Sequence, residues 1–331
     1  MGAAPEPEDV GEALERAVDW LLEARTAGGW WRDFALAPGR SDEWVTAYTG
    51  AVLADTASPR ARAAAAEGWQ LLRECHDRSG GWGYNAWTPC DADSTAWALQ
   101  LADRLGAAGD ERAALGHEFL ACHLRDDGGV TTYADEAPIR RFTGIGAERS
   151  FAGWCGSHVC VTAAVALSPR YRARTVEFLR ATQLIDGSWP SYWWCDDAYA
   201  TALAARALRA QGDTGDRRRL GRAVAWAGAH LSDNDGSAFA TAYCVDLVRE
   251  VPEARVAAVA RLLECQRSDG SWPPSARLRV PYPDTVDPGL QRDWVPGGRI
   301  EGSVVLDDQA IFTTATALAA LTSPRRNGRP T

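Results

Sequence analysis

One unit of sequence occurs six times along this chain of 331 residues, and it constrains the fold more than any other feature. Each copy begins with an amphipathic segment, in which apolar residues recur at i, i+3 and i+4 with arginine and glutamate between them. A glycine-rich turn follows, and then a segment that is small and apolar on nearly every side. Each copy therefore predicts a helical hairpin with one half-polar and one buried helix.

The six copies predict a closed arrangement. The amphipathic segments are 10–25, 61–76, 113–125, 169–183, 218–231 and 254–266, and the apolar segments start near Asp42, Asp91, Ser157, Asp197, Ser237 and Asp308. Helices that are apolar all round are buried best as an inner ring, with the amphipathic helices packed outside. We therefore predict an all-α fold, a single (α/α)6 barrel, and one domain over residues 1–331.

Two connections into the inner ring are much longer than the others. A threonine recurs near the start of each apolar segment (Thr46, Thr95, Thr162, Thr201, Thr241 and Thr314), and relative to it the long connections cover about 128–156 and 271–306. The helices that follow them lie opposite each other in a six-membered ring. We expect these loops to cover the mouth of the barrel from two sides, because long structured loops in compact domains usually carry function.

The position two residues before this threonine differs in chemistry among the copies. It holds Trp44, Asp93, Cys160, Tyr199, Phe239 and Phe312. One carboxyl group is thus expected among aromatic rings at the barrel mouth, which suits a proton donor beside faces that stabilise a cation. A purely structural role, with Asp91 as a helix cap and Asp93 in the first turn, explains the aspartates but not the aromatic residues.

The motifs around these residues resemble a known family. The segments Leu179–Trp189 and Leu262–Trp272 share the pattern Leu-x3-Gln-x3-Gly-x-Trp, which is similar to the QW repeat of squalene-hopene and oxidosqualene cyclases. Leu72–Trp82 is a third copy with His76 at the glutamine position. The run Asp-Ala-Asp-Ser-Thr-Ala from Asp91 resembles the DxDD signature of class II terpene cyclases.

The resemblance implies a reaction and a role for each acidic residue. In that family the middle aspartate protonates a terminal alkene or epoxide, and aromatic residues stabilise the carbocations. Carried over, Asp93 is the general acid, while Asp91 and Ser94 hold its proton in the reactive orientation. The chain is then a bacterial class II terpene cyclase that performs proton-initiated cyclisation or isomerisation of a linear isoprenoid, either a diphosphate or an isoprenoid-bearing metabolite.

The same resemblance and the register of the inner helices indicate which side chains bind the substrate. They are Trp44, Tyr199, Phe239, Phe312, His158, Cys160, Asp197, Trp154 and Trp194. His158 shares the register of Asp42, Asp91 and Asp197, so we expect it at the mouth. There it would cap a helix or accept the proton released when cyclisation ends.

The chain departs from the family pattern in two ways. Ser94 stands where the last aspartate of the signature belongs, so the hydrogen bonds that tune the acid must differ. Family enzymes place the active site between two helical domains, and this chain has one. The pocket closes by the long loops, by homodimerisation, or around a smaller substrate.

No cofactor is implied, and Mg²⁺ enters only if the substrate is a diphosphate. Arginines in the two loops are the candidates for holding a phosphate: Arg140, Arg141, Arg277, Arg279, Arg292 and Arg299. Related protein prenyltransferase barrels hold zinc, but Ala200 occupies the place of their histidine ligand. We therefore predict no metal site.

Two other functions remain open. A carbohydrate-active barrel pairs two carboxylates across a cleft, and Asp93 with Asp197 or Asp42 would form such a pair. The other is a non-catalytic, cyclase-like barrel that binds an apolar ligand, in which Ser94 marks a lost acid.

Charge and hydropathy exclude further classes. A net charge of −9 argues against nucleic-acid binding, which needs a basic face. No apolar run approaches the roughly 18 residues of a transmembrane helix, and the polar, acidic N-terminal segment is no secretory signal. We expect a cytoplasmic protein whose partner is a small apolar isoprenoid.

Overall fold

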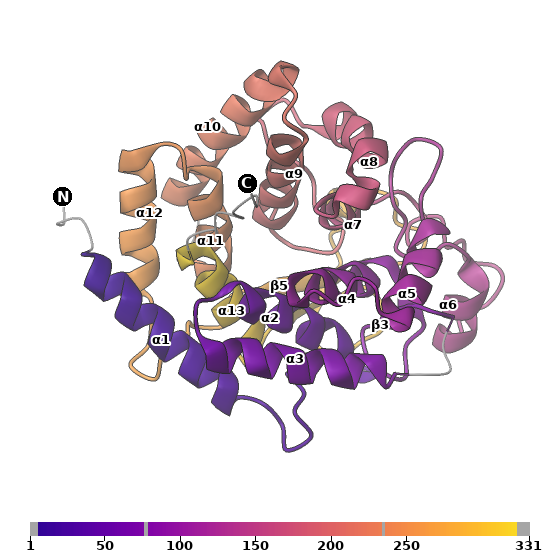
Figure 1. Ribbon diagram of the computed structural model, residues 1–331. Helices are drawn as coiled ribbons and strands as arrows, with labels where there is room; N and C mark the ends of the chain where they lie inside the picture. Colours follow the sequence, from indigo (N-terminus) through magenta and orange to yellow (C-terminus); the bar gives the residue numbers. More distant parts are fainter. Residues whose placement is uncertain (1–5, 76–78, 234–235, 323–331) are drawn as a thin grey trace.

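The computed structural model describes residues 6–75, 79–233 and 236–322. Its inner helices are α2 (Glu43–Asp55), α4 (Ala92–Leu105), α7 (Val159–Ala166), α9 (Ala198–Gln211), α11 (Ala238–Leu247) and α13 (Ile311–Leu321). Each contacts the next, and α13 contacts α2, so the ring is closed (Figure 1). The helices packed outside are α1 (Pro7–Glu23), α3 (Pro59–Arg73), α5 (Glu111–Ala121), α8 (Pro169–Thr182), α10 (Arg217–Asp233) and α12 (Pro252–Glu264). The predicted all-α (α/α)6 barrel is confirmed.

Burial separates the two sets of helices as their composition predicts. Nearly every residue of α2 is buried, whereas α10 buries only Ala223 and Ala227 among its described side chains. None of the described helices is long and apolar enough to cross a membrane.

In four of the units a buried tryptophan fastens the turn between the outer and the inner helix. Trp31, Trp82, Trp189 and Trp272 are fully buried. Each indole N–H donates to the backbone carbonyl ten residues earlier in the outer helix, at 2.6–2.8 Å. The backbone N–H of the same tryptophan donates to the hydroxyl of the recurring threonine of the inner helix, at 2.9–3.1 Å. One residue thus joins both helices of its unit.

The glutamines of the repeated motif connect neighbouring units. The side-chain amide of Gln183 donates to the carbonyl oxygens of Gly187 and Arg219, both at 2.9 Å, and so links α8 to α10. Gly187 has a φ of +101°, and a Cβ there would collide with the backbone of Arg222. Only glycine allows the next outer helix this close. His76, which stands at the glutamine position of the third copy, lies outside the described residues.

The first and last units meet at a carboxylate. Asp33 accepts the backbone N–H groups of Ile311 at 2.9 Å and Phe312 at 3.2 Å, so a residue of the first unit caps α13. Helix α13 therefore starts three residues later than the Asp308 predicted from the sequence.

The barrel mouth carries short elements that the sequence did not predict. Strand β1 (Asp33–Leu36) pairs antiparallel with β2 (Gly39–Ser41), and β3 (Trp82–Gly83) with β4 (Cys90–Asp91). In the 271–306 loop, β7 (Ser303–Leu306) pairs antiparallel with β5 (Arg277–Val280) and parallel with β6 (Val295–Pro296). Helix α6 (Glu136–Thr143) lies in the 128–156 loop, and a 3-10 turn (Pro288–Leu290) lies in the 271–306 loop. A second 3-10 turn, Thr214–Asp216, lies at the opposite end of the barrel, between α9 and α10.

We predict that the buried indole bond matters for stability. In Trp272→Phe the Leu262 carbonyl loses the indole hydrogen bond and keeps only the longer one from the Cys265 backbone N–H, at 3.3 Å. A void also opens, so the free energy of unfolding should fall by about 2–3 kcal/mol. Trp87→Phe, at a side chain that is 78% exposed, should change it by less than about 0.5 kcal/mol. Urea denaturation followed by circular dichroism measures both, and equal losses in the two variants would contradict the role of the buried bond.

Candidate active site

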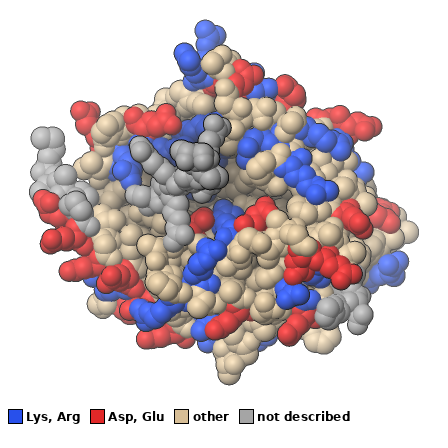
Figure 2. Space-filling model, in the orientation of Figure 1, with Lys and Arg blue, Asp and Glu red and all other residues tan. Residues whose placement is uncertain are grey.

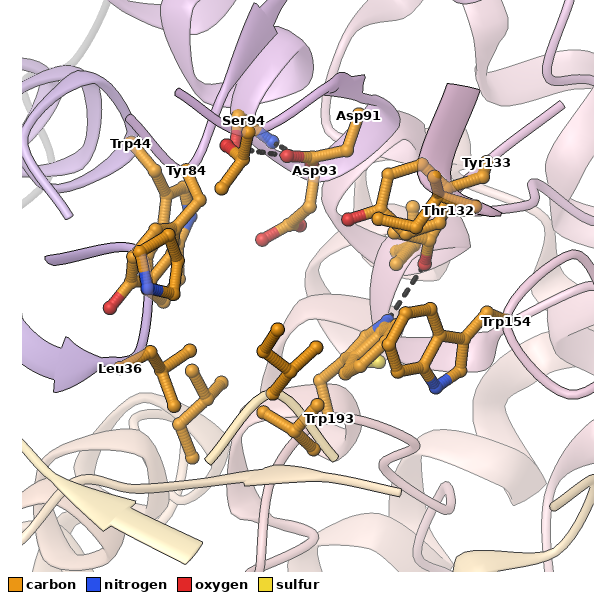
Figure 3. Close-up of a pocket in the computed structure, with 18 of the residues that line it drawn as sticks. Leu36, Trp44, Tyr84, Asp91, Asp93, Ser94, Thr132, Tyr133, Trp154 and Trp193 are labelled. Atoms are coloured by element: carbon orange, nitrogen blue, oxygen red, sulfur yellow. Dashed lines mark hydrogen bonds between the residues drawn. The ribbon is translucent and has the colours of Figure 1, made fainter. Parts of the chain in front are cut away.

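The barrel has a cavity at the end where the inner helices begin (Figure 3). It contains about 870 Å³ of space not filled by atoms, counting the part open to solvent. This size and a mainly aromatic and aliphatic lining suit a small apolar ligand.

Several segments of the chain build the wall. The starts of the inner helices contribute Trp44, Asp91, Asp93, Ser94, Cys160, Val161 and Tyr199. The 128–156 loop contributes Thr132, Tyr133, Ile139, Phe142, Thr143 and Trp154, and the 271–306 loop contributes Leu278, Val280 and Ile300. Leu36, Pro38, Tyr84 and Thr88 come from the small hairpins, and Trp193 and Trp194 precede α9. Both long loops therefore face the cavity.

Asp93 points into the cavity from the first turn of α4 (Figure 3). Its Oδ1 atom is fully buried and has no hydrogen-bond partner among the described residues. Burial, and then the charge of Asp91, raise the pKa of Asp93 well above its usual value, while Trp44 and Tyr199 lower it only in part. The described groups that act on this pKa include no cation. The site thus favours the protonated acid.

The side chains of Asp91 and Ser94 are bonded to each other rather than to the Asp93 carboxyl group, unlike the arrangement that the resemblance implied. Asp91 Oδ1 accepts the backbone N–H of Ser94 at 2.8 Å, and Oδ2 accepts the Ser94 hydroxyl at 2.7 Å (Figure 3). The physical reason is that a helix N-terminus offers unpaired N–H groups, and the N-cap side chain takes them. Burial raises the pKa of Asp91 to about 6, and its charge acts on Asp93 through space.

The side chain of Trp194 lies between the cavity and two of the six equivalent inner-helix residues, Phe239 and Phe312. Its indole packs against Phe239 with ring centroids 4.9 Å apart and against Phe312 at 5.2 Å. Both phenylalanines are buried below it and do not line the cavity, unlike the arrangement that the register predicted. The segment before α9 turns over the barrel axis, held by a β-bridge between Trp194 and Leu278, and no helical register could predict this.

Of the other residues expected to bind the substrate, some line the cavity and others are buried behind its lining. Trp154 lines the cavity, as the sequence led us to expect of a mouth residue. His158 is buried behind Thr132, to which it is hydrogen-bonded. Asp197 accepts the backbone N–H of Ser191 at 2.7 Å and does not line the cavity.

Sequence reasoning missed several lining residues because they lie in irregular segments. Tyr84, Thr132 and Tyr133 belong to the hairpins and loops between outer and inner helices, whereas the sequence reasoning compared only positions within the inner helices. The nearest signal in the sequence that these segments contribute to the cavity wall was the length of the two long loops. Trp154 shows how the loops are joined, since its indole N–H donates to the Pro281 carbonyl at 3.0 Å.

No arginine lines the cavity within the described part of the chain. Arg279 donates to the backbone oxygens of Ser191 and Tyr192, and Arg140 donates to the Arg149 carbonyl at 2.9 Å, so these guanidinium groups brace the loops. The residues described contain no group of histidine, cysteine and acidic side chains that could hold a metal ion. Acidic and basic side chains are interspersed over the face seen in Figure 2.

Comparison with known structures gives close matches. No protein-family model matches the sequence, and no curated protein matches it. The type II terpene cyclase MstE from Scytonema is 42% identical, with a TM-score of 0.91, over 95% of this chain and 97% of that one. The chain belongs to the type II terpene cyclases. Structures of MstE include complexes with geranylgeranyl dihydroxybenzoate as substrate and merosterolic acid A as product.

Two further structures extend the comparison of this terpene cyclase. A protein from Actinoplanes is 38% identical, with a TM-score of 0.87, over 94% of this chain and 98% of that one. An ent-copalyl diphosphate synthase from Streptomyces platensis is 21% identical, with a TM-score of 0.56, over 85% of this chain and 50% of that one, which shows a shared fold.

Membership of this family confirms the predicted enzyme class and proton-initiated cyclisation. The carbohydrate-active and non-catalytic alternatives are therefore set aside. The geometry agrees, because the proposed carboxylate partners of Asp93 are engaged elsewhere: Asp42 with Arg32 at 3.0 Å and Asp197 with the Ser191 backbone. Reactions that begin with a proton from an aspartate need no cofactor.

We predict that Asp91 helps to keep Asp93 protonated in this terpene cyclase. Asp91→Asn keeps a side chain that caps helices well but removes a negative charge, so the pKa of Asp93 should fall. NMR titration of protein labelled with ¹³C at the aspartate side-chain carboxyl carbons measures this. Asp110→Asn, the same change at the N-cap of α5, should leave the Asp93 pKa unchanged. A pKa that stays or rises in Asp91→Asn would refute the electrostatic role.

Proposed function

We propose that this terpene cyclase protonates and cyclises a linear isoprenoid chain attached to a head group other than a diphosphate. The proposal rests on one observation. The surroundings of Asp93 favour the protonated form of its carboxyl group, which points into an apolar, aromatic cavity. Asp93 is the general acid in this proposal. Structures of MstE variants in which one aspartate is replaced, solved with substrate or product bound, support an aspartate at the centre of such a site.

The walls suit the cation that protonation creates. Trp44 and Tyr199 flank Asp93 and influence its pKa, so their rings lie where positive charge first develops. Aromatic faces within about 6 Å of a cation attract it through the ring quadrupole. Tyr133, Trp154 and Trp193 lie across the cavity from Trp44 (Figure 3), where they would face cations formed later along the folded chain.

The lack of cationic side chains among the described lining residues favours an aromatic head group with at most one negative charge over a diphosphate. Binding a diphosphate needs arginine, lysine or Mg²⁺ to balance its charge. Among the described residues the lining holds no arginine, and no metal-binding cluster exists. Geranylgeranyl dihydroxybenzoate, the substrate bound by MstE, is the kind of molecule this cavity suits.

We also propose that the two long loops replace a second helical domain. Residues of both loops line the cavity from one chain, which removes the main reason for expecting a homodimer. A single domain over 1–331 is part of this proposal. The cytoplasmic location stays a prediction.

The assay that tests the proposal supplies two substrates. Purified protein is incubated with geranylgeranyl dihydroxybenzoate and, separately, geranylgeranyl diphosphate with and without Mg²⁺, and products are identified by mass spectrometry. We expect a cyclic isomer from the first substrate only. Asp93→Asn should lower its rate of formation by at least about 10²-fold, because the proton donor is lost.

Asp103→Asn is the matched control for Asp93→Asn. Asp103 lies on the same helix but faces a cavity at the opposite end of the barrel, so its replacement should leave cyclisation intact. Full activity of Asp93→Asn would remove Asp93 as the acid. Conversion of the diphosphate alone would overturn the head-group assignment.

A further inference from the structure

Three side chains, two in one wall of the cavity and one behind it, form an ordered chain of hydrogen bonds. The indole N–H of Trp193 donates to the Thr132 hydroxyl oxygen at 2.7 Å (Figure 3). Thr132 Oγ1 lies 2.7 Å from His158 Nδ1, and His158 Nε2 lies 2.7 Å from the Gly153 carbonyl oxygen. Thr132 lines the cavity, whereas His158 is buried behind it and stacks on Tyr192 at a centroid distance of 3.8 Å.

The chemistry of the partners sets the direction of each bond. A carbonyl oxygen only accepts, so His158 carries its proton on Nε2 and leaves a lone pair on Nδ1. The Thr132 hydroxyl therefore donates to Nδ1 and accepts from Trp193. One of the two lone pairs on the Thr132 oxygen then receives no hydrogen bond from the described residues.

Every cyclisation that starts by adding a proton to an alkene must end by removing one or by capturing a nucleophile. We propose that Thr132 and His158 together take the final proton, with Thr132 touching the cation and His158 storing the charge. This proposal rests on the proposed function and names the acceptor that completes its reaction.

The step balances as follows. A C–H bond next to the last cationic carbon breaks, and its electron pair becomes the π bond of the product alkene. The proton joins the free lone pair of Thr132 Oγ1, while the original hydroxyl proton passes to His158 Nδ1. His158 becomes an imidazolium whose Nε2–H remains bonded to the Gly153 carbonyl. When the product leaves, the proton returns along the same path to water entering the cavity.

The environment of His158 suits a temporary acceptor. Burial lowers the pKa of His158 to about 4, so the ring is neutral before the reaction and gives the proton up readily afterwards. The donor is a carbocation, which is a far stronger acid than an imidazolium, so transfer is favourable despite this low pKa.

Three other hydroxyl groups on the wall, those of Tyr84, Thr143 and Ser94, are less suited to this step. Those of Tyr84 and Thr143 donate to the backbone carbonyls of Phe34 and Ile139, which cannot carry the proton away. The Ser94 hydroxyl donates to Asp91, directly beside the acid that starts the reaction. The charge of Asp91 already serves to raise the pKa of Asp93.

The experiment compares product ratios rather than rates alone, with the substrate that the wild-type protein cyclises. Thr132→Val keeps the shape but removes the hydroxyl, and the alkene that dominates in the wild type should fall by at least about ten-fold relative to isomeric alkenes and water-captured alcohols. The substrate should still be consumed, because protonation by Asp93 comes earlier. Thr132→Ser should restore the wild-type ratio.

A second variant removes the base and keeps the hydrogen bonds. In His158→Gln the side-chain amide can still donate to the Gly153 carbonyl and accept from Thr132, but it is a much poorer proton acceptor, so the product ratio should shift as in Thr132→Val. This variant also keeps the proposal testable if Thr132→Val fails to fold.

The matched control is the neighbouring residue. Thr131 is buried, does not line the cavity, and its hydroxyl has no partner within the described chain, so Thr131→Val should keep the wild-type ratio. Wild-type ratios in both Thr132→Val and His158→Gln, or a shift in Ser94→Ala instead, would overturn the relay while the proposed function stands. A wild-type protein that cyclises neither substrate would overturn both.

Discussion

The whole barrel depends on a buried tryptophan that is bonded to two helices at once. In four units its indole N–H satisfies a carbonyl of the outer helix, and its backbone N–H satisfies the threonine hydroxyl of the inner helix. Polar groups buried without partners are costly, so in these units the bonds set where the inner helix begins. The third unit has Val130 at this place and keeps only the backbone bond to Thr162, at 2.8 Å.

Because the helix starts are set in this way, six N-termini converge on one end of the barrel, each with unpaired N–H groups. Carboxylates of neighbouring residues occupy several of these positions: Asp33 caps α13, Asp42 bonds the first N–H of α2, and Asp91 caps α4. At the start of α4 the backbone N–H of Ser94 is thereby engaged by Asp91 rather than by the Asp93 carboxyl. Asp93 is left buried, beside a negative charge and without a cation, which is the setting a strong neutral acid needs.

The repeat predicted the fold and the position of the acid because both follow from register. Equivalent residues of a closed ring lie at the same height, so Trp44, Asp93, Cys160 and Tyr199 reach the cavity as expected. The same argument fails for Phe239 and Phe312, because the Trp194 side chain from an irregular segment lies over them. It also fails for Ser94, whose partner is decided by which oxygen a helix cap presents.

The sequence alone determined the hairpin unit, the closed ring and the mouth loops, since each follows from local periodicity and spacing, and the acidic motif was identified by its resemblance to a family signature. Tertiary structure decided what the loops place around the acid: the Trp194 layer, the hairpin residue Tyr84, and the contact of Thr132 with His158. These contacts join residues without a common register. Their geometry comes from packing and hydrogen bonds between distant segments, which no pattern within one segment records.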